Sequence, residues 1–424
     1  MNKYSSYKDS GVEWIGEIPN HWLNTKYKFH TSVLSGFPFK SELFDKEEGF
    51  PILRIRDITS GSSETFYKGE YKEEYVVKRG DLLIGMDGDF NIRWWDNNDV
   101  LLNQRCCSIK EFNSVSRRFL FYVLPFDLQV INDLTYYTTV KHLSNSDIYN
   151  SSLVVPPLKE QQQIVSYLDD KTQKIDSLLQ KKERKIEILR EKRTSLINHV
   201  VTKGLDPNVV MKDSGVEWIG EIPSHWGCFK MKYGVNHISE KDQPDKLDIK
   251  ISPENVESNT GVCFNLYSEH GSEGMKFISG DVLLNKLRLY LKKILFTEYD
   301  GYSLGEMIVL RTNENLLNKY FYHILFNQGI IDLLDSQSTG VKLPRVSPEI
   351  IMNTEIIYPP IKEQQQIVEY LDEQTKEIDT LIQLEQNKIE LLKEYRQSLI
   401  LEVVTGKIRV CEEDHSLNLE SQTV

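Results

Sequence analysis

Several classes of protein are excluded by what the sequence lacks. No apolar run approaches the roughly 18 residues of a membrane-spanning helix, and the first residues are polar where a secretory signal would have an apolar core. We therefore expect a cytoplasmic protein. The five cysteines are an odd number and form no Cys-x-x-Cys pair, so neither a disulfide framework nor a zinc site is predicted. Cys106 and Cys107 are adjacent, and we interpret them as strand residues that face opposite sides rather than as metal ligands.

Catalytic motifs are also missing. The catalytic loop of an adenine methyltransferase needs Asn or Asp before Pro-Pro and an aromatic residue after it, whereas the two Pro-Pro pairs here read VPPL at 155–158 and YPPI at 358–361. No Gly-x-Gly cofactor loop, Gly-Lys-Ser/Thr phosphate loop or His-Glu-x-x-His helix occurs. Asp87 and Asp89 have the spacing of carboxylates that share a metal, but Gly88 between them favours a hairpin turn. We assign no catalytic residue and no metal site.

Positive charge is scarce for a protein that binds DNA. The chain has 51 basic and 63 acidic residues, a formal net charge of −12, whereas neutralising phosphates normally requires a basic surface. If DNA is bound, local basic patches must bind it, and partner subunits must supply part of the contact with phosphates. We expect the isolated chain to bind DNA weakly.

Two long repeats show that the chain is a duplication. Residues 8–22 read KDSGVEWIGEIPNHW and residues 212–226 read KDSGVEWIGEIPSHW, so 14 of 15 positions match. The stretch PPLKEQQQIVSYLDDKTQKIDSLLQ at 156–180 is repeated as PPIKEQQQIVEYLDEQTKEIDTLIQ at 359–383. A period of about 200 residues is far longer than that of a solenoid repeat, and it indicates domain duplication.

Each copy consists of a variable body and a helical tail. The bodies, about residues 23–155 and 227–358, contain short β-rich runs separated by Gly, Asp and Asn, which predicts α+β domains. Asp87-Gly88, between the apolar runs at 82–84 and 92–95, predicts a hairpin because Gly tolerates a positive φ.

A heptad pattern follows each Pro-Pro pair, which suits a helix entrance. The pattern predicts about 36 helical residues, or roughly 54 Å, in each copy. The predicted interface positions are Leu168, Ile175, Leu179, Lys182, Ile186 and Leu189 in the first copy, and Leu371, Ile378, Ile382, Glu385, Ile389 and Leu392 in the second.

The two helices are predicted to pair with each other. Residues 156–205 hold 11 basic and 7 acidic residues, a net +4, and residues 359–408 hold 6 and 10, a net −4. An antiparallel pair is expected, because the first helix leads to a second body that returns to the second helix. Lys182 and Glu385, which interrupt the heptads near mid-helix, are then expected to lie close together.

The two motifs DSGVEWIGEIPxHW and PPxKEQQQIVxYLD, each present twice, resemble those of the specificity subunits of type I restriction-modification systems. The resemblance covers nearly the whole chain. It implies target recognition domains at 1–155 and 206–358 and conserved coiled-coil helices at 156–205 and 359–408. The polar, acidic residues 409–424 are predicted to form a disordered tail.

The resemblance also implies a function. The chain is expected to be a non-catalytic subunit in which each recognition domain, similar to that of Taq-type adenine methyltransferases, reads one half of a bipartite asymmetric DNA site. The helices would fix the unread spacer. Two modification subunits and the restriction subunits would be its partners, and S-adenosylmethionine, ATP and Mg would be bound by those partners, with no cofactor on this chain.

Base reading needs Arg, Lys, Asn and Gln with aromatic or apolar neighbours. Any one of these residues could equally be a solvated surface charge, but grouped residues favour contact with DNA. The candidates in the first body are Arg54, Arg56, Asn91, Arg93, Gln104, Arg105, Tyr137, Thr138 and Lys141. Those in the second body are Asn285, Lys286, Arg288, Tyr290, Lys292, Thr339, Lys342 and Arg345.

Some features recur in both copies. Thr-x-Val-Lys precedes each helix, at 138–141 and 339–342, which favours a shared phosphate contact. Trp14 and Trp218 recur while the bodies differ, so we interpret them as packing where body meets helix or as binding a shared partner. The Lys-Glu-Gln-Gln-Gln stretches allow the same two interpretations.

Two other hypotheses remain open at this stage. A stand-alone DNA methyltransferase or nuclease remnant would transfer methyl groups from S-adenosylmethionine without partners. A coiled-coil scaffold that binds no DNA is compatible with the acidic charge, but it gives no reason for two unlike bodies.

Overall fold

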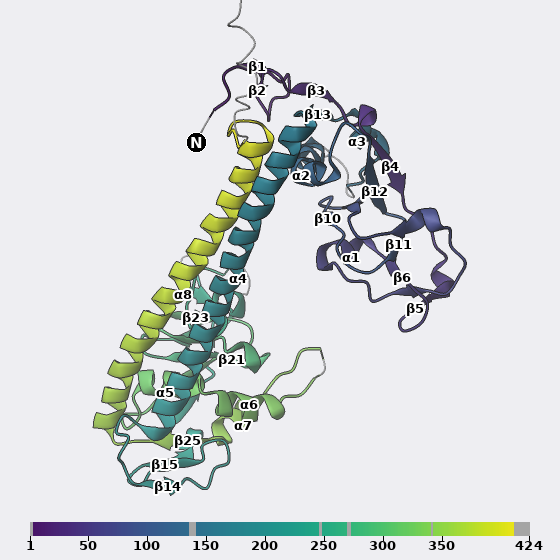
Figure 1. Cartoon of the computed structure of the whole chain (residues 1–424). Helices are drawn as coiled ribbons and strands as arrows, with labels where there is room; N and C mark the ends of the chain where they lie inside the picture. The colour runs from purple at the N-terminus through teal and green to yellow at the C-terminus, as the bar shows by residue number, and fades with distance from the viewer. Residues whose placement is uncertain (1–2, 135–140, 246–247, 269–272, 341, 411–424) are drawn as a thin grey trace, which may run out of the picture. The chain divides into compact units, whose positions relative to one another are not determined.

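The computed structural model describes residues 3–134, 141–245, 248–268, 273–340 and 342–410 (Figure 1). The predicted disordered tail lies outside the described residues from 411 onward. The chain forms two compact units. Unit 1 is Met1–Leu179 with Glu390–Val424, and unit 2 is Gln180–Ile389. Each unit therefore contains one body and a part of each long helix.

The body of unit 1 is built on two sheets. The larger core lies under the four-stranded sheet β10-β9-β12-β4, and the second sheet has the order β5-β7-β6-β11-β8. Two-stranded pairs β1-β2 and β3-β13 join the body to the helices. The strands are β1 (Tyr7–Asp9), β2 (Glu17–Pro19), β3 (Leu23–Lys26), β4 (Thr31–Ser35), β5 (Phe44–Asp45), β6 (Phe50–Leu53), β7 (Phe66–Tyr67), β8 (Val76–Val77), β9 (Leu82–Gly85), β10 (Ile92–Trp94), β11 (Val100–Leu102), β12 (Cys106–Glu111) and β13 (Ser152–Val155). The helices are η1 (Tyr27–Phe29), η2 (Ser41–Leu43), α1 (Ile55–Ser60), η3 (Glu73–Tyr75), α2 (Arg117–Leu134), α3 (Asn145–Asn150) and α4 (Leu158–Lys203).

The body of unit 2 repeats the first sheet and changes the second. The sheet β17-β24-β21-β22 corresponds in order to β4-β12-β9-β10, whereas the other sheet, β18-β20-β23-β19, has four strands instead of five. The strands are β14 (Met211–Asp213), β15 (Glu221–Pro223), β16 (Gly227–Lys230), β17 (Val235–Ile238), β18 (Lys241–Asp242), β19 (Lys250–Ile251), β20 (Gly274–Phe277), β21 (Val282–Asn285), β22 (Ile294–Phe296), β23 (Gly301–Ser303), β24 (Met307–Thr312) and β25 (Glu355–Tyr358). The helices are η4 (Met231–Tyr233), η5 (Pro253–Asn255), η6 (Leu289–Leu291), α5 (Asn318–Leu325), α6 (Gln328–Ser336), α7 (Pro348–Asn353) and α8 (Ile361–Val404).

Two local predictions for the first body are confirmed. β9 and β10 pair antiparallel with Ile84 opposite Ile92, and Gly88 between them has φ of 75°. The segment is therefore the predicted hairpin. Cys107 belongs to the larger core and Cys106 to a smaller one, so these strand neighbours do face opposite sides.

The long helices pair antiparallel within each unit. In unit 1, Asp176 of α4 accepts from Arg396 Nε of α8 at 2.9 Å. In unit 2, Lys182 Nζ lies 2.7 Å from Glu385 Oε2, which confirms their expected proximity, and Arg193 Nε lies 2.9 Å from Asp379 Oδ1. As the residue number rises along α4, from 176 to 182 to 193, the number of its partner in α8 falls, from 396 to 385 to 379. The two helices are therefore antiparallel. The α+β architecture with paired helices is confirmed.

The helices are longer than the heptads alone indicated. α4 has 46 residues and α8 has 44, against the expected number of about 36. The predicted interface positions begin at Leu168, whereas α4 begins directly after Pro156-Pro157. Seven of the twelve predicted interface positions are buried, namely Leu168, Ile175, Ile186, Leu371, Ile378, Glu385 and Ile389.

Candidate nucleic-acid interface

Three segments meet at one end of the main sheet in unit 1. They are the hairpin 86–91 after β9, the turn 103–105 before β12, and residues 141–143 before α3. Met86 N donates to Arg105 O at 2.8 Å, Leu143 N donates to Met86 O at 2.7 Å, and Gly88 N donates to Lys141 O at 3.2 Å. We call these residues the first edge. Of the predicted residues, it brings together Asn91, Gln104, Arg105 and Lys141.

A carboxylate organises the charges of the first edge. Asp87 Oδ1 lies 2.7 Å from His142 Nδ1 and 3.3 Å from Arg105 Nη1. Lys141 Nζ donates to Asn132 Oδ1. Asn132 Nδ2 in turn donates to Gly88 O at 3.0 Å. The Arg105 side chain is more than half exposed, so its remaining donors face solvent. Asp87 thus holds the Arg105 and His142 side chains at the end of the sheet, where both stay accessible to a ligand.

Unit 2 forms the same arrangement from corresponding segments. Lys286 N donates to Glu306 O at 3.0 Å, Val346 N donates to Lys286 O at 3.0 Å, and Arg288 N donates to Pro344 O at 2.9 Å. We call residues 285–290, 304–306 and the described residues of 339–346 the second edge. It brings together seven of the predicted residues, namely Asn285, Lys286, Arg288, Tyr290, Thr339, Lys342 and Arg345.

The second edge also has a central carboxylate. Glu306 Oε1 accepts from Arg345 Nη2 at 2.5 Å, and Glu306 Oε2 lies 3.4 Å from Lys286 Nζ. Arg288 Nη2 donates to Lys342 O at 3.4 Å, and Tyr290 is half exposed. The two edges therefore share a plan, a carboxylate between two basic side chains, but differ in the side chains that they present. This is the chemistry expected of sites that read different base edges.

Three predicted residues of the first body lie apart from its edge, around α1. Arg93 Nη1 donates to Thr59 O at 2.9 Å and thereby ties β10 to α1. Arg54 precedes α1, and its backbone N donates to Asp57 Oδ2 at 2.8 Å. Arg56 is exposed. Arg93 and the Arg54 backbone therefore support α1, and only Arg56 offers an exposed basic side chain there.

Lys292 is predicted among the DNA contacts, and the structure places it in the interior of unit 2. Its side chain is buried, and Nζ donates to Phe326 O at 3.0 Å. Burial lowers the pKa of Lys292 to about 8. Asn285 is also buried, and its amide bonds to the backbone of Leu287 in both directions. Both side chains therefore support the backbone of residues 285–292. Tyr137 and Thr138 lie outside the described residues.

The Glu of each Lys-Glu-Gln-Gln-Gln stretch joins a body to its helix. Glu160 Oε1 lies 2.6 Å from His21 Nε2, and its Oε2 accepts from Trp22 Nε1 at 2.9 Å. Glu363 repeats this with His225 at 2.7 Å and Trp226 at 2.8 Å. The two recurring motifs of the sequence therefore recur because they contact each other.

The following Gln completes each junction. Gln161 is fully buried, and it accepts from Ser116 N at 2.7 Å and donates to Pro156 O at 2.8 Å. Gln364 makes the equivalent bonds to Leu317 N and Pro359 O at 2.8 and 2.9 Å. Packing of body on helix is thus the role of these residues, although sequence reasoning left a shared partner open. The recurrence of both His-Trp and Glu-Gln in each copy, 139 and 138 residues apart, was the signal for it.

Trp14 and Trp218 pack differently in the two units. Trp14 stacks on Phe126 with ring centroids 5.9 Å apart. Trp218 packs beside Gly329, where a Cβ would lie 2.9 Å from the Trp218 carbonyl oxygen. Both tryptophans therefore contact residues of their own body.

Sequence reasoning missed a buried acid. Asp127 is buried in unit 1 and accepts from Tyr27 Oη at 2.5 Å. Burial raises the pKa of Asp127 to about 7, and Tyr27 opposes the shift by donating to the carboxylate. One hundred residues separate the pair, so no local pattern points to it. Unit 2 has Met231 at the position of Tyr27 in the repeat.

Within the described ranges, no group of three or more His, Cys, Asp or Glu side chains is arranged to hold a metal ion. The same ranges contain no helix with the length and apolarity needed to cross a membrane.

The fold and the two edges define a class, that of duplicated recognition proteins in which two unlike bodies share a pair of helices. The family model for the type I restriction modification DNA specificity domain matches residues 32–188 and 280–393. The chain therefore belongs to the family of type I restriction-modification specificity subunits. It is the subunit that determines DNA recognition within the complex, and its family is non-catalytic, the catalytic cofactors residing on the modification and restriction subunits.

Individual relatives cover almost the full length. The chain is 26% identical to the specificity subunit of the type I restriction enzyme EcoBI of Escherichia coli, over 94% of this chain and 89% of that protein. It is 24% identical to the MjaVIII specificity subunit of Methanocaldococcus jannaschii, over 93% of this chain and 94% of that one. A solved chain from a study of complex assembly and conformational transition of the type I system has a TM-score of 0.65 at 16% identity, over 92% and 99% of the two chains. This last likeness supports the fold.

Proposed function

We propose that the chain reads a bipartite, asymmetric DNA site, with the first edge on one half and the second edge on the other. The observation that carries the proposal is that both units bring the same three segments together around a carboxylate. The side chains presented there differ, Arg105 and His142 on one edge against Lys286 and Arg345 on the other. Unlike side chains on a common frame favour unlike half-sites.

Phosphate contacts are proposed for Lys141 and Lys342. Each closes a Thr-x-Val-Lys sequence ahead of its helix and belongs to its edge. Lys342 is exposed and Lys141 is partly exposed. A basic residue shared by two otherwise different edges suits a contact with the phosphate backbone, which is the same in both half-sites.

The docking of two modification subunits is proposed on the helices. Large apolar side chains are exposed on them at positions that the repeat relates. In unit 1 these are Leu178 and Leu391, and in unit 2 they are Leu381 and Ile188. The mates Leu178 and Leu381, like Ile188 and Leu391, occupy the same position in the two copies. A pair of helices that needed only each other would keep this face polar, so one copy of a common partner per unit accounts for it.

The remaining components of the system follow from these partners. S-adenosylmethionine is proposed to bind to the modification subunits, and ATP and Mg to partner subunits of the complex. Restriction subunits are proposed to join the assembly. A partner set that acts on cellular DNA implies that the chain works in the cytoplasm.

The test is to co-express the chain with the modification subunit encoded beside it and to map methylated adenines across the host genome. We expect one split motif with unlike halves and a fixed spacer. A continuous motif, or no methylation from a stable complex, would contradict the two-edge proposal. Methylation by the chain alone would instead favour a stand-alone methyltransferase.

A further inference from the structure

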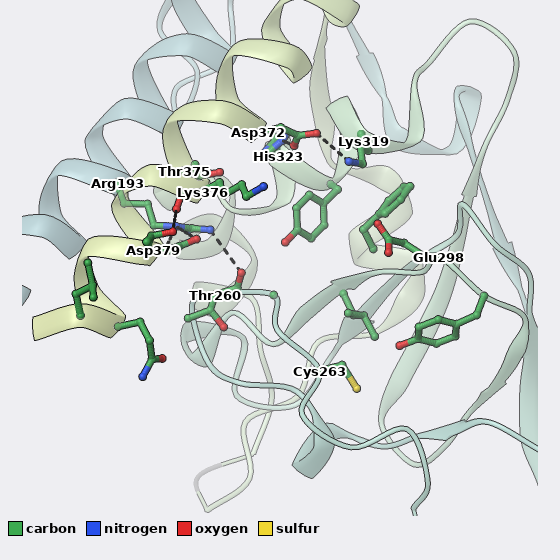
Figure 2. A pocket seen from close by; sticks show the side chains of 18 residues that line it. Arg193, Thr260, Cys263, Glu298, Lys319, His323, Asp372, Thr375, Lys376 and Asp379 are labelled. Atoms are coloured by element: carbon green, nitrogen blue, oxygen red, sulfur yellow. Dashed lines mark hydrogen bonds and ion pairs between the residues drawn. The ribbon is translucent and has the colours of Figure 1, made fainter. Parts of the chain in front are cut away.

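Arg193 of α4 ties the second body to the helices. Its Nε lies 2.9 Å from Asp379 Oδ1 of α8, and Nη2 donates to Thr260 O at 3.4 Å (Figure 2). Nη1 donates to Asn259 O at 3.3 Å. The Arg193 side chain is about nine-tenths buried. One guanidinium thus bridges both helices and a loop of the body, using the fork of donors that Arg alone provides.

The loop that Arg193 holds leads directly to the second edge. Asn259 N donates to Leu291 O at 3.2 Å and to Lys292 O at 3.4 Å. Leu291 ends η6, which follows Arg288 of the second edge. A chain of hydrogen bonds therefore runs from α4 through the loop to the segment that presents Arg288 and Tyr290.

A second path connects the same points. The Arg193 guanidinium carbon lies 5.5 Å from the centroid of the Phe326 ring, and Phe326 O accepts from Lys292 Nζ. Lys292 and Arg288 both have positive φ, 44° and 53°, a backbone conformation that is costly for residues with a side chain. The support beneath η6 offsets that cost, and Arg193 is part of the support.

Two cavities adjoin this contact. They have volumes of about 980 and 950 Å³, and both are lined by Arg193, Thr260, Asp379 and Gln383. The Arg193 guanidinium therefore joins the loop to the helices at a place where cavities lie beside the contact.

Unit 1 provides the contrast. Arg396 of α8 occupies the same heptad position as Arg193 in the other copy. Within the part of unit 1 that the structure describes, its hydrogen bonds go to Asp176, at 2.9 and 3.4 Å, and none goes to a loop of the first body. The ion pair is duplicated, but the connection to an edge is found only in unit 2.

We infer that Arg193 is a positioning residue that sets the orientation of the second edge relative to the helices. Arg193 does not touch DNA. It makes the second half-site readable only at one distance and angle from the helices. This inference rests on the proposed two-edge function, and it assigns control of spacer length in part to one side chain.

The experiment uses the complex with the modification subunit and the split site found by methylation mapping. Affinity is measured for duplexes with the native spacer and with one base pair added or removed. For Arg193→Met we expect the preference for the native spacer to fall about tenfold, the size of a lost charge-assisted hydrogen-bond pair. The matched variant Arg396→Met should keep the wild-type preference.

Two further measurements keep the test decisive. Arg193→Lys retains the charge but cannot bond both carbonyls, so we expect it to lose the preference for the native spacer as well. It replaces Arg193→Met in the test if that variant does not assemble. Hydrogen exchange in the free chain should rise at 257–262 and 285–293 in Arg193→Met, and not in Arg396→Met. Unchanged exchange and unchanged spacer preference in Arg193→Met would overturn the inference. A wild-type complex indifferent to spacer length, with exchange rising as expected, would overturn the proposed function and leave the positioning contact standing.

Discussion

The two units solve the same task with different side chains. In unit 1 the central carboxylate is Asp87, with Arg105 and His142, and in unit 2 it is Glu306, with Lys286 and Arg345. The main sheet, its strand order and the junction to the helix are the same in both. The comparison separates the parts of the duplication that are alike in both units from the two edges, which differ and which we propose to contact DNA.

Removing the junction glutamine should give the largest loss of stability. Gln161→Ala leaves the partly buried Ser116 N–H without its acceptor, at a cost of up to about 1–3 kcal/mol, the range for a buried group left unpaired. Gln364→Ala should cost a similar amount in unit 2. Urea unfolding measures both, and the neighbouring exposed Gln162→Ala and Gln365→Ala are the matched controls. Equal stability of Gln161→Ala and Gln162→Ala would show that the junction contributes little.

Substituting one basic residue should separate the two edges. Arg345→Ala should cost about 1–3 kcal/mol in binding and relax the specificity of the second half-site alone. Arg105→Ala should do the same to the first half-site. Binding to duplexes randomised in one half at a time measures the effect. Relaxation of both halves by either variant would contradict the assignment of one edge to each half.

The buried Asp127 of unit 1 should make the stability of the protein depend on pH. Because the pKa of Asp127 is raised to about 7 in the folded state, its contribution to stability is present below the unfolded pKa of about 4 and declines as the pH rises toward 7. Asp127→Asn should remove this decline. Urea unfolding of the wild-type protein and of Asp127→Asn at pH 5 and pH 7 measures the change in stability of each. An equal change in the two proteins would contradict burial of the acid.

Phosphate contacts should have the smallest effect and should be alike in the two units. Lys141→Ala and Lys342→Ala should each weaken binding to all sequences and reduce the slope of log affinity against log salt by about 1. Affinity measured over a range of salt concentrations tests this. A variant with wild-type affinity and slope would remove that lysine from the phosphate-binding set.

Sequence was informative where the chain repeats itself. The helices, their antiparallel pairing and the approach of Lys182 to Glu385 followed from the heptads and from the charge of each copy. The hairpin at Gly88 followed from turn chemistry. These features depend on local pattern, and local pattern is preserved in both copies.

Sequence was less informative where long-range packing decides. Lys292, in a Lys-Lys pair, has the pattern of an exposed residue, and only the position of Phe326 shows that it is buried. The local sequence indicates a turn at Asp87 and gives no signal at Glu306, because an acidic residue is not an obvious DNA contact. Their role depends on segments more than 15 residues away in the chain, Arg105 for Asp87 and Arg345 for Glu306.

The most direct test of the central claim is to exchange one body. Residues 23–155 are replaced by the first body of a relative that reads another site, and methylated adenines are mapped after co-expression with the modification subunit. We predict a motif in which one half changes while the other half and the spacer stay the same. A change in both halves, or in neither, would contradict the account of two independent edges on a shared pair of helices.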